Sequence, residues 1–196
     1  LFSAKRLDLL KETFLAFHVS GGTTEALLVT PNDTDLFSVR IVGQSLDLKA
    51  GQLIDRTGVM LSLPFPCGKD LEVLSEHSDK TYNVKPTMKG ADCCLSGIEN
   101  QCQAKYRKGE SPADIAKFCM CSVLAALSEM VSVLRKEYGD LPVLFSGGVS
   151  YNKLLKKELT EKYGAIFAEP AFSADNAAGI AVLTALMQKG SSFYEL

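Results

Sequence analysis

Short apolar runs separated by turn-forming residues dominate the N-terminal part of the chain. Residues 14–19, 25–30 and 36–42 are rich in large apolar side chains, and Gly21-Gly22 and Pro31-Asn32-Asp33 separate them. Runs of strand length that are bounded by Gly, Pro and Asn are typical of β-strands joined by tight turns. The pattern therefore predicts a three-stranded antiparallel meander.

Apolar residues then recur with the period of a helix. Over residues 46–63 they are spaced three or four apart, which predicts an amphipathic helix that stops at Pro64. Residues 118–127 are apolar nearly all round, so the helix that contains them should be central in the fold. Further helices are predicted at 71–76, 96–106, 112–138, 152–163 and 175–188, an irregular linker at 80–90, and strands at 141–145 and 165–168.

This element order predicts the fold class. A meander, a crossover helix and then parallel strands with helices is the order of one lobe of the actin-like, sugar-kinase and heat-shock-ATPase superfold, which is an α/β fold. Residues 1–196 are expected to form one such lobe with a helical insertion. Residues 14–63 would supply the meander and first helix, residues 64–140 the mostly helical insertion, and residues 141–196 the rest of the lobe.

The tripeptide Ser-Gly-Gly occurs twice, each time directly after a predicted strand. The first copy is Ser20-Gly21-Gly22 and the second is Ser146-Gly147-Gly148. Paired glycines leave backbone N–H groups bare at the end of a strand, where a phosphate can approach without meeting a Cβ. Each loop alone is also explained by a tight turn that needs glycine. The repetition suggests a nucleotide between the two loops.

Composition and charge are those of an ordinary globular enzyme. Of the 196 residues 46% are hydrophobic and 22% are charged, and the formal net charge of -2 gives no overall basic field to recruit nucleic acid. We expect no apolar stretch that approaches the roughly 18–20 residues of a membrane span, and no membrane association. The chain starts at Leu1 without a leader pattern, so we expect a fragment of a longer, cytoplasmic protein.

The cysteines and histidines are expected to be structural. The cysteines have mostly apolar neighbours and form no C-x-x-C pair, which favours reduced thiols packed in a core over the alternative of a soft-metal cluster. His18 lies in a predicted buried strand and is expected to be a hydrogen-bonded core group, whereas His77 is expected at the surface or at a helix cap. The cysteines are Cys67, Cys93, Cys94, Cys102, Cys119 and Cys121.

Six segments taken together resemble one known family. They are similar, in the same order, to the motifs of the TsaD family, the tRNA adenosine threonylcarbamoyltransferases that were once described as glycoproteases. The similarity covers nearly the whole chain from residue 14 and corresponds to the C-terminal lobe of the family, just after a helix that carries two metal-binding histidines. The segments are FHVSGGTTE (17–25), LKAGQLIDR (48–56), PFPCG (64–68), LSGI (95–98), SGGVSYN (146–152) and SADNAA (173–178).

The resemblance implies a role for individual residues. The first Ser-Gly-Gly loop would hold the substrate phosphate or carbamate, and Asp55 and Gly68 would contact the adenosine of an adenine nucleotide or adenylate. Asp175 would be one ligand of a divalent metal, iron or zinc, whose histidine ligands lie outside this chain. No catalytic residue is assigned. The implied substrate-binding or nucleotide-binding residues are Val19, Ser20, Gly21, Gly22, Thr23, Asp55, Gly68 and Asn152.

The implied activity is the transfer of a threonylcarbamoyl group from its adenylate to the N6 amine of a tRNA adenosine, with metal assistance. The implied partners are tRNA as substrate and a smaller, related subunit. A protease is disfavoured, because the residues suggest no Ser/His/Asp or Cys/His set. Taken alone, Asp175 would also serve as a helix cap and Asp55 as a solvent-facing carboxylate.

The chain departs from the family at four positions. Members commonly have histidine at Thr23, glutamate at Gln52, glycine at Cys67 and lysine at Glu99. Glu99 reverses a charge close to what should be an anionic substrate. The alternative function is therefore a catalytically weakened nucleotide-binding scaffold that pairs with a related subunit.

Overall fold

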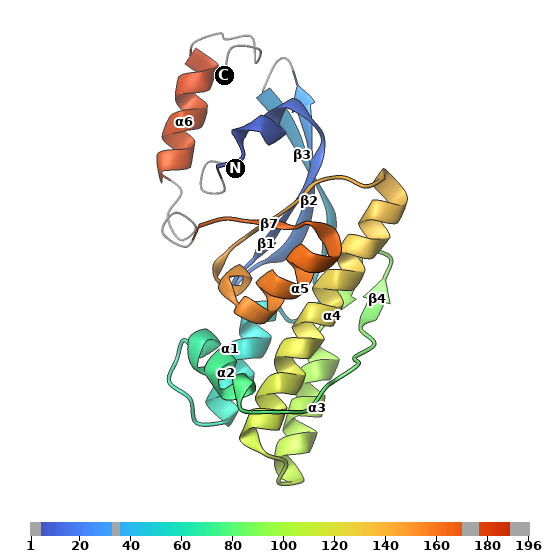
Figure 1. Ribbon diagram of the computed structural model, residues 1–196, viewed down its shortest axis with the longest axis vertical. Helices are drawn as coiled ribbons and strands as arrows, with labels where there is room; N and C mark the ends of the chain where they lie inside the picture. The colour runs from blue at the N-terminus through green and yellow to red at the C-terminus, as the bar shows by residue number, and fades with distance from the viewer. Residues whose placement is uncertain (1–4, 33–35, 170–176, 189–196) are drawn as a thin grey trace.

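A five-stranded mixed sheet organises the molecule (Figure 1). The computed structural model describes residues 5–32, 36–169 and 177–188. In the order β3-β2-β1-β6-β7, the first three strands form the predicted antiparallel meander, and β6 and β7 add to β1 in parallel. The strands are β1 (Phe14–Val19), β2 (Thr24–Asn32), β3 (Leu36–Gln44), β6 (Val143–Ser146) and β7 (Ile166–Phe167).

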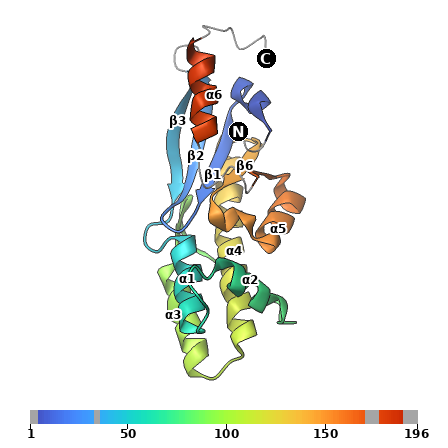
Figure 2. The ribbon, with the colours of Figure 1, turned by 90° about the vertical axis from the view of Figure 1, so that its left-hand side faces the viewer.

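The helices gather mainly at one end of the sheet. In both views α1, α2, α3 and the first part of α4 extend beyond the sheet, and α6 lies at the opposite end of the molecule (Figure 1; Figure 2). The α-helices are α1 (Ala50–Met60), α2 (Gly68–Glu76), α3 (Ser96–Arg107), α4 (Pro112–Tyr138), α5 (Lys153–Tyr163) and α6 (Ala177–Gln188), and two short 3₁₀ helices are η2 (Leu7–Lys11) and η3 (Gly148–Tyr151).

The alternation along β1 places apolar side chains on both faces of the sheet. Leu15, Phe17 and Val19 belong to the large core that includes α4 and α5. Phe17 stacks on Phe145 of β6 with ring centroids 4.7 Å apart. On the other face, Phe14 joins a smaller cluster that includes residues of η2, β2 and β6. Because β1 is buried from both sides, its carboxyl end is a well-fixed base for the loop that follows.

Helix α4 is the central helix, as the sequence predicts. Its buried residues run along its length, from Ala113 to Leu134. The expectation that no segment approaches membrane length was wrong, because an 18-residue window within α4 has a mean hydropathy of 1.6. Within this structure 56% of that window is buried. The apolar character of the helix therefore accounts for its contacts with the core.

Helix α1 is shorter than the sequence predicts. It begins at Ala50 instead of residue 46, because Lys49 has an extended ψ of 152°. The Asp47 carboxylate accepts a hydrogen bond from the amide of Leu48 at 2.6 Å and another from Leu95 at 2.7 Å. These bonds hold residues before the helix in a local turn, which competes with helix formation.

A small hairpin occupies the end of the irregular linker expected at residues 80–90 and the residues that lead from it to α3. Strands β4 (Thr87–Lys89) and β5 (Asp92–Cys94) pair antiparallel, and Gly90 between them has a φ of +62°. Strands of three residues are too short for an alternation pattern to be seen in the sequence.

Candidate functional site

The two Ser-Gly-Gly loops meet at one edge of the sheet. Strands β1 and β6 pair in parallel with His18 opposite Ser146, so both loops leave the sheet side by side. Gly147 has a φ of +94°, and a Cβ at this position would overlap the Val19 carbonyl. Only glycine allows the second loop to approach the end of β1 this closely.

The first loop is closed by its own hydrogen bonds. The Ser20 amide donates to the Thr23 carbonyl at 2.8 Å, and the Thr23 amide donates to the Ser20 hydroxyl at 3.1 Å. The Ser20 hydroxyl therefore stabilises the turn itself. This result supports the tight-turn explanation for the serine, while leaving the glycines to be explained.

The N-terminus of α1 supports the same loop. The amide of Gly51 donates to the Ser20 carbonyl at 3.2 Å, and the amide of Ala50 donates to the Thr24 hydroxyl at 2.9 Å. A Cβ on Gly51 would come within 2.5 Å of the Gly21 Cα. Helix α1 thus starts in direct contact with the loop, and Gly51 is required for that contact.

The second glycine of each Ser-Gly-Gly loop has no packing role. Gly22 and Gly148 are not buried, and a Cβ built at either position meets no atom within 4 Å. Neither has a positive φ that would exclude other residues. Their lack of a side chain therefore leaves the space above the loops open, as a bound anion would require.

Asp55 reaches the loop that carries Gly68. Its carboxylate accepts a hydrogen bond of 2.9 Å from the amide of Cys67, the residue before α2. Burial, followed by the charges of Asp55 and Asp70, raises the pKa of the Cys67 thiol. Cys67 also lies against Gly58 of α1, where a Cβ would overlap its side chain. The structure thus brings the two residues implied to contact adenosine into neighbouring positions.

The remaining predicted residues differ in their surroundings. Asn152 is buried and caps α5, because its side-chain oxygen accepts a hydrogen bond from the Leu155 amide at 3.1 Å. Val19 is buried in the core and lines the loop contact only through its backbone. Asp175 lies outside the described residues.

His18 is a residue at the site that the sequence did not assign to it. It is half-buried at the end of β1, and its Nδ1 lies 3.2 Å from the Ser146 hydroxyl oxygen. The expectation of a hydrogen-bonded residue was confirmed, but its partner belongs to the second loop. The sequence holds no signal for this pair, because the two residues are 128 positions apart. His77 lies exposed at the end of α2, as expected.

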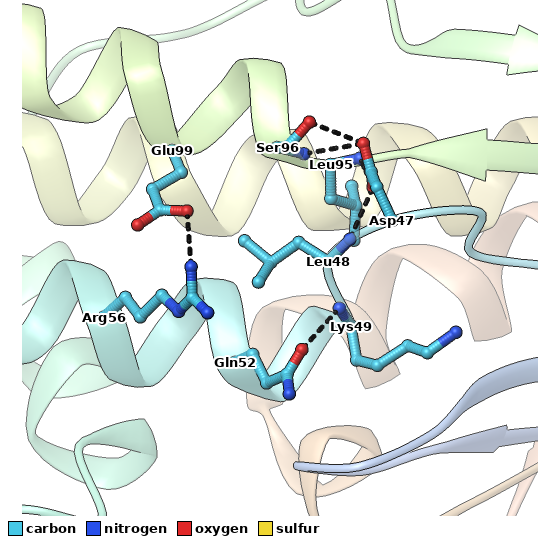
Figure 3. A network of polar contacts seen from close by, with 8 residues as sticks. All are labelled: Asp47, Leu48, Lys49, Gln52, Arg56, Leu95, Ser96 and Glu99. Atoms are coloured by element: carbon cyan, nitrogen blue, oxygen red, sulfur yellow. Dashed lines mark hydrogen bonds and ion pairs between the residues drawn. The ribbon is translucent and has the colours of Figure 1, made fainter.

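A polar network ties α1 to α3 beside the site (Figure 3). The Asp47 carboxylate accepts hydrogen bonds from the Ser96 hydroxyl at 2.5 Å and the Ser96 amide at 3.2 Å. Partial burial favours the neutral form of this carboxyl, but its hydrogen bonds from Ser96, Leu95 and Leu48 outweigh that effect and lower its pKa.

Two departures from the family find partners in this network. The Glu99 carboxylate forms an ion pair of 3.1 Å with Arg56 of α1, so the reversed charge is balanced locally. Gln52 accepts a hydrogen bond of 3.1 Å from the Lys49 amide at the start of α1 (Figure 3). Both side chains therefore have a structural role in this chain.

The cysteines are free thiols, most of them buried. The Cys119 thiol hydrogen-bonds to Cys102 and lowers the pKa of Cys102, while the same contact together with burial raises the pKa of Cys119. Among residues 5–32, 36–169 and 177–188, no three His, Cys, Asp or Glu side chains are grouped closely enough to hold a metal ion. The packing interpretation of the cysteines agrees with this arrangement.

A cavity of about 300 Å³ opens between α1 and α3, away from the two loops. Arg56, Met60, Glu99 and Tyr106 contribute to its walls. The loops contact the first turn of α1, whereas these residues lie on its later turns and on α3. None of the residues predicted to bind substrate lines it.

Comparison with known families identifies relatives along almost the whole chain. The model of the family described as "TsaD: tRNA N6-adenosine threonylcarbamoyltransferase" matches residues 2–182. A protein of that name from Pelodictyon phaeoclathratiforme is 31% identical over 88% of this chain and 55% of its own length. One from Thermus thermophilus is 31% identical over 86% of this chain and 52% of its own. The chain thus spans about half the length of these curated relatives.

Solved structures with little sequence identity show the same fold. HypF, crystallised in a phosphate- and nucleotide-bound form, superposes with a TM-score of 0.66 at 14% identity over 84% of this chain and 38% of its own. Component A of (R)-2-hydroxyglutaryl-CoA dehydratase from Acidaminococcus fermentans superposes with a TM-score of 0.57 at 19% identity, over 91% of this chain and 62% of its own. The predicted fold class is confirmed.

Proposed function

Because this chain belongs to the tRNA N6-adenosine threonylcarbamoyltransferase (TsaD) family, we propose that it forms the nucleotide-binding half of such an enzyme. The reaction would transfer a threonylcarbamoyl group from its adenylate to the N6 amine of an adenosine in tRNA. The observation that carries the proposal is the meeting of two glycine loops at the carboxyl edge of β1 and β6. Ligands in open α/β sheets bind at such an edge.

The phosphate of the adenylate would lie over the two loops. Gly21, Gly22 and Gly148 present backbone there without side chains, and a Cβ at any of them would meet open space. Backbone N–H groups in such turns form concave sites for anions. Thr23 and Ser20 would shape the first loop through their mutual hydrogen bonds instead of contacting the phosphate with their hydroxyls.

The adenosine would lie toward α1 and α2. Asp55 holds the amide of Cys67, and Gly68 follows at the exposed start of α2. One carboxylate oxygen of Asp55 is used in this bond, and a carboxylate can accept several hydrogen bonds. The free acceptor positions would serve the ribose hydroxyls. Asn152 would contribute mainly by fixing the start of α5 behind the second loop.

In the transfer reaction, the two loops that bind the phosphate would mainly position the adenylate. The N6 amine would attack the carbamoyl carbon, the new C–N bond would form, and the bond between that carbon and the phosphate oxygen would break. AMP would leave with the electron pair, and the amine would lose one proton. Holding the adenylate with its carbonyl oriented toward the acceptor lowers the entropic part of the barrier.

The divalent metal and the other binding partners would also need the half of the family fold that this chain does not span. The described residues offer no set of three ligands, and Asp175 would be a single one. We infer that the remaining ligands, the rest of the nucleotide cleft and the contact with a smaller related subunit come from the half of the family fold that this chain does not span. We call this chain together with that half the complete enzyme. A metal would act there by polarising the acyl carbonyl.

A nucleotide-binding scaffold is the second candidate function. The departures from the family at Thr23 and Glu99 favour it. Glu99 forms an ion pair with Arg56, and it presents no positive charge to a substrate. A scaffold would bind an adenine nucleotide but transfer nothing.

Two measurements on the complete enzyme separate the candidates. Calorimetry with a non-hydrolysable adenylate analogue reports binding, and mass spectrometry of nucleosides from treated tRNA reports transfer. Binding with transfer supports the enzyme, binding without transfer supports the scaffold, and the absence of binding refutes the site at the loops.

A further inference from the structure

The hydroxyl of Ser146 stands between a histidine and a backbone carbonyl. Its oxygen lies 3.3 Å from the Phe17 carbonyl oxygen and 3.2 Å from Nδ1 of His18. A carbonyl oxygen can only accept, and a hydroxyl has a single proton to donate. With the Ser146 proton on the Phe17 carbonyl, the serine oxygen is left to accept from Nδ1–H of His18.

This chain of bonds fixes the tautomer of His18. In a neutral imidazole one ring nitrogen carries the proton and the other carries a lone pair. Since Nδ1 donates to Ser146, the lone pair resides on Nε2. A ring nitrogen held in this way is a ready acceptor for a proton or for a hydrogen bond from a ligand.

His18 lies at the edge of the sheet that both loops share. His18 is one residue before Val19, whose carbonyl a Cβ on Gly147 would overlap, and it lies opposite Ser146 in the register of β1 and β6. Its partner in the antiparallel register with β2 is Glu25, so imidazole, hydroxyl and carboxylate form a row on one face of the sheet. His18 is half-buried at this edge.

We propose that His18 is the general base of the transfer reaction and that Ser146 is the residue that positions it. The proposal rests on the proposed function. As the C–N bond forms and the bond from the carbamoyl carbon to the phosphate oxygen breaks, Nε2 takes the proton that the N6 amine loses. AMP leaves with the electron pair, and the resulting imidazolium returns its proton to water.

The tautomer can be measured on the 196-residue chain without any substrate. The ¹⁵N chemical shifts of labelled histidine at pH about 8, where imidazoles are mostly neutral, distinguish a protonated from an unprotonated ring nitrogen. His77→Gln assigns the two signals. We expect the Nδ1–H form for His18 and a mixture of tautomers in Ser146→Ala. An Nε2–H form in the unsubstituted chain would overturn the proposal.

The catalytic consequence is tested in the complete enzyme with variants matched in shape. His18→Asn retains an N–H group near the Nδ1 position but has no basic nitrogen. We expect its kcat to fall at least about 100-fold, the usual contribution of a general base, with KM for tRNA changed by less than about 3-fold. Ser146→Ala should lower kcat about 10-fold, and Ser146→Thr, which keeps the hydroxyl, should restore most of it.

The outcomes separate this proposal from the proposed function. If unsubstituted enzyme transfers the group and His18→Asn transfers it equally fast, His18 is not the base and the proposed function stands. If the unsubstituted enzyme binds the adenylate but transfers nothing, both proposals are wrong. Thermal unfolding of each variant within about 3 °C of the unsubstituted protein, a shift of roughly 1 kcal/mol, shows that the fold is retained.

Discussion

At the scale of residues, the glycines of the two loops and of the helix beside them divide into two kinds. Gly147 and Gly51 are required by packing, because a Cβ at either would overlap backbone atoms of the first loop or of the strand before it. Gly22 and Gly148 face open space, so packing imposes no requirement for glycine at either position. The sequence alone does not distinguish the two kinds, and only the structure separates them.

This division predicts opposite effects of substitution. In the complete enzyme Gly22→Val and Gly148→Val should each weaken nucleotide binding at least about 10-fold and leave the unfolding temperature almost unchanged, because each adds a side chain only in the open space where the proposed ligand would lie. Gly147→Val should instead destabilise the fold by about 3 kcal/mol or more, since it adds both a clash and a strained φ. Calorimetry and thermal unfolding measure the two effects. Unchanged binding in both exposed variants would contradict the site.

Asp55 can be tested for its structural and its binding role at once. Asp55→Ala should lose the bond to the Cys67 amide, which costs about 1 kcal/mol of stability, and should also weaken nucleotide binding. Asp55→Asn retains an acceptor for that amide, so we expect it to recover the stability while binding remains weakened. If both variants bind the nucleotide as the unsubstituted protein does, Asp55 is only a structural residue.

At the scale of elements, the sequence predicted the bounds best where an apolar pattern runs along the whole element. Strand β1 and helix α4 occur with the predicted bounds, because burial along each follows directly from the spacing of apolar residues. Helix α1 was predicted too long, since the side-chain bonds of Asp47 that hold the preceding turn do not alter the apolar pattern. The parallel register that brings His18 to Ser146 could not be predicted from the sequence, because long-range pairing leaves no local signal.

The link between α1 and α3 should depend on pH through Asp47. Its pKa is lowered in the folded protein, so the charged carboxylate stabilises the fold at neutral pH and this contribution disappears as the pH falls below about 4. At pH about 7, Asp47→Ala should cost about 1–3 kcal/mol, because the amides of Leu95 and Ser96 lose their acceptor. Urea unfolding at several pH values measures this difference. A difference that stays constant down to pH about 3 would contradict the assigned role.

At the scale of the whole molecule, the proposed function implies that this chain supplies one side of a two-sided site. The loops, α1 and the start of α2 come together on the described residues, while the curated relatives are about twice as long as the matched region. A ligand pocket usually encloses most of its ligand. The 196-residue chain alone should therefore bind AMP or ATP with a Kd weaker than about 100 μM. Calorimetry that gives sub-micromolar binding by this chain alone would show that the site needs no second half.

The metal provides a second test at this scale. A single carboxylate binds a transition metal weakly, so the isolated chain should retain none after dialysis, whereas the complete enzyme should carry about one ion. Asp175→Ala in the complete enzyme should remove the ion and the transfer activity together and leave nucleotide binding intact. Elemental analysis of both proteins, purified without oxygen, gives the metal content. A variant that lacks Asp175 and still holds the ion would exclude it as a ligand.

The most direct test of the central claim is mass spectrometry of nucleosides from tRNA incubated with the complete enzyme and threonylcarbamoyl adenylate. The account predicts threonylcarbamoyl-modified adenosine with the unsubstituted enzyme and at least about 10-fold less with Gly148→Val, since that substitution fills the open space over the second loop. Bound nucleotide with no modified adenosine would contradict an enzymatic role and leave the scaffold as the function of this chain.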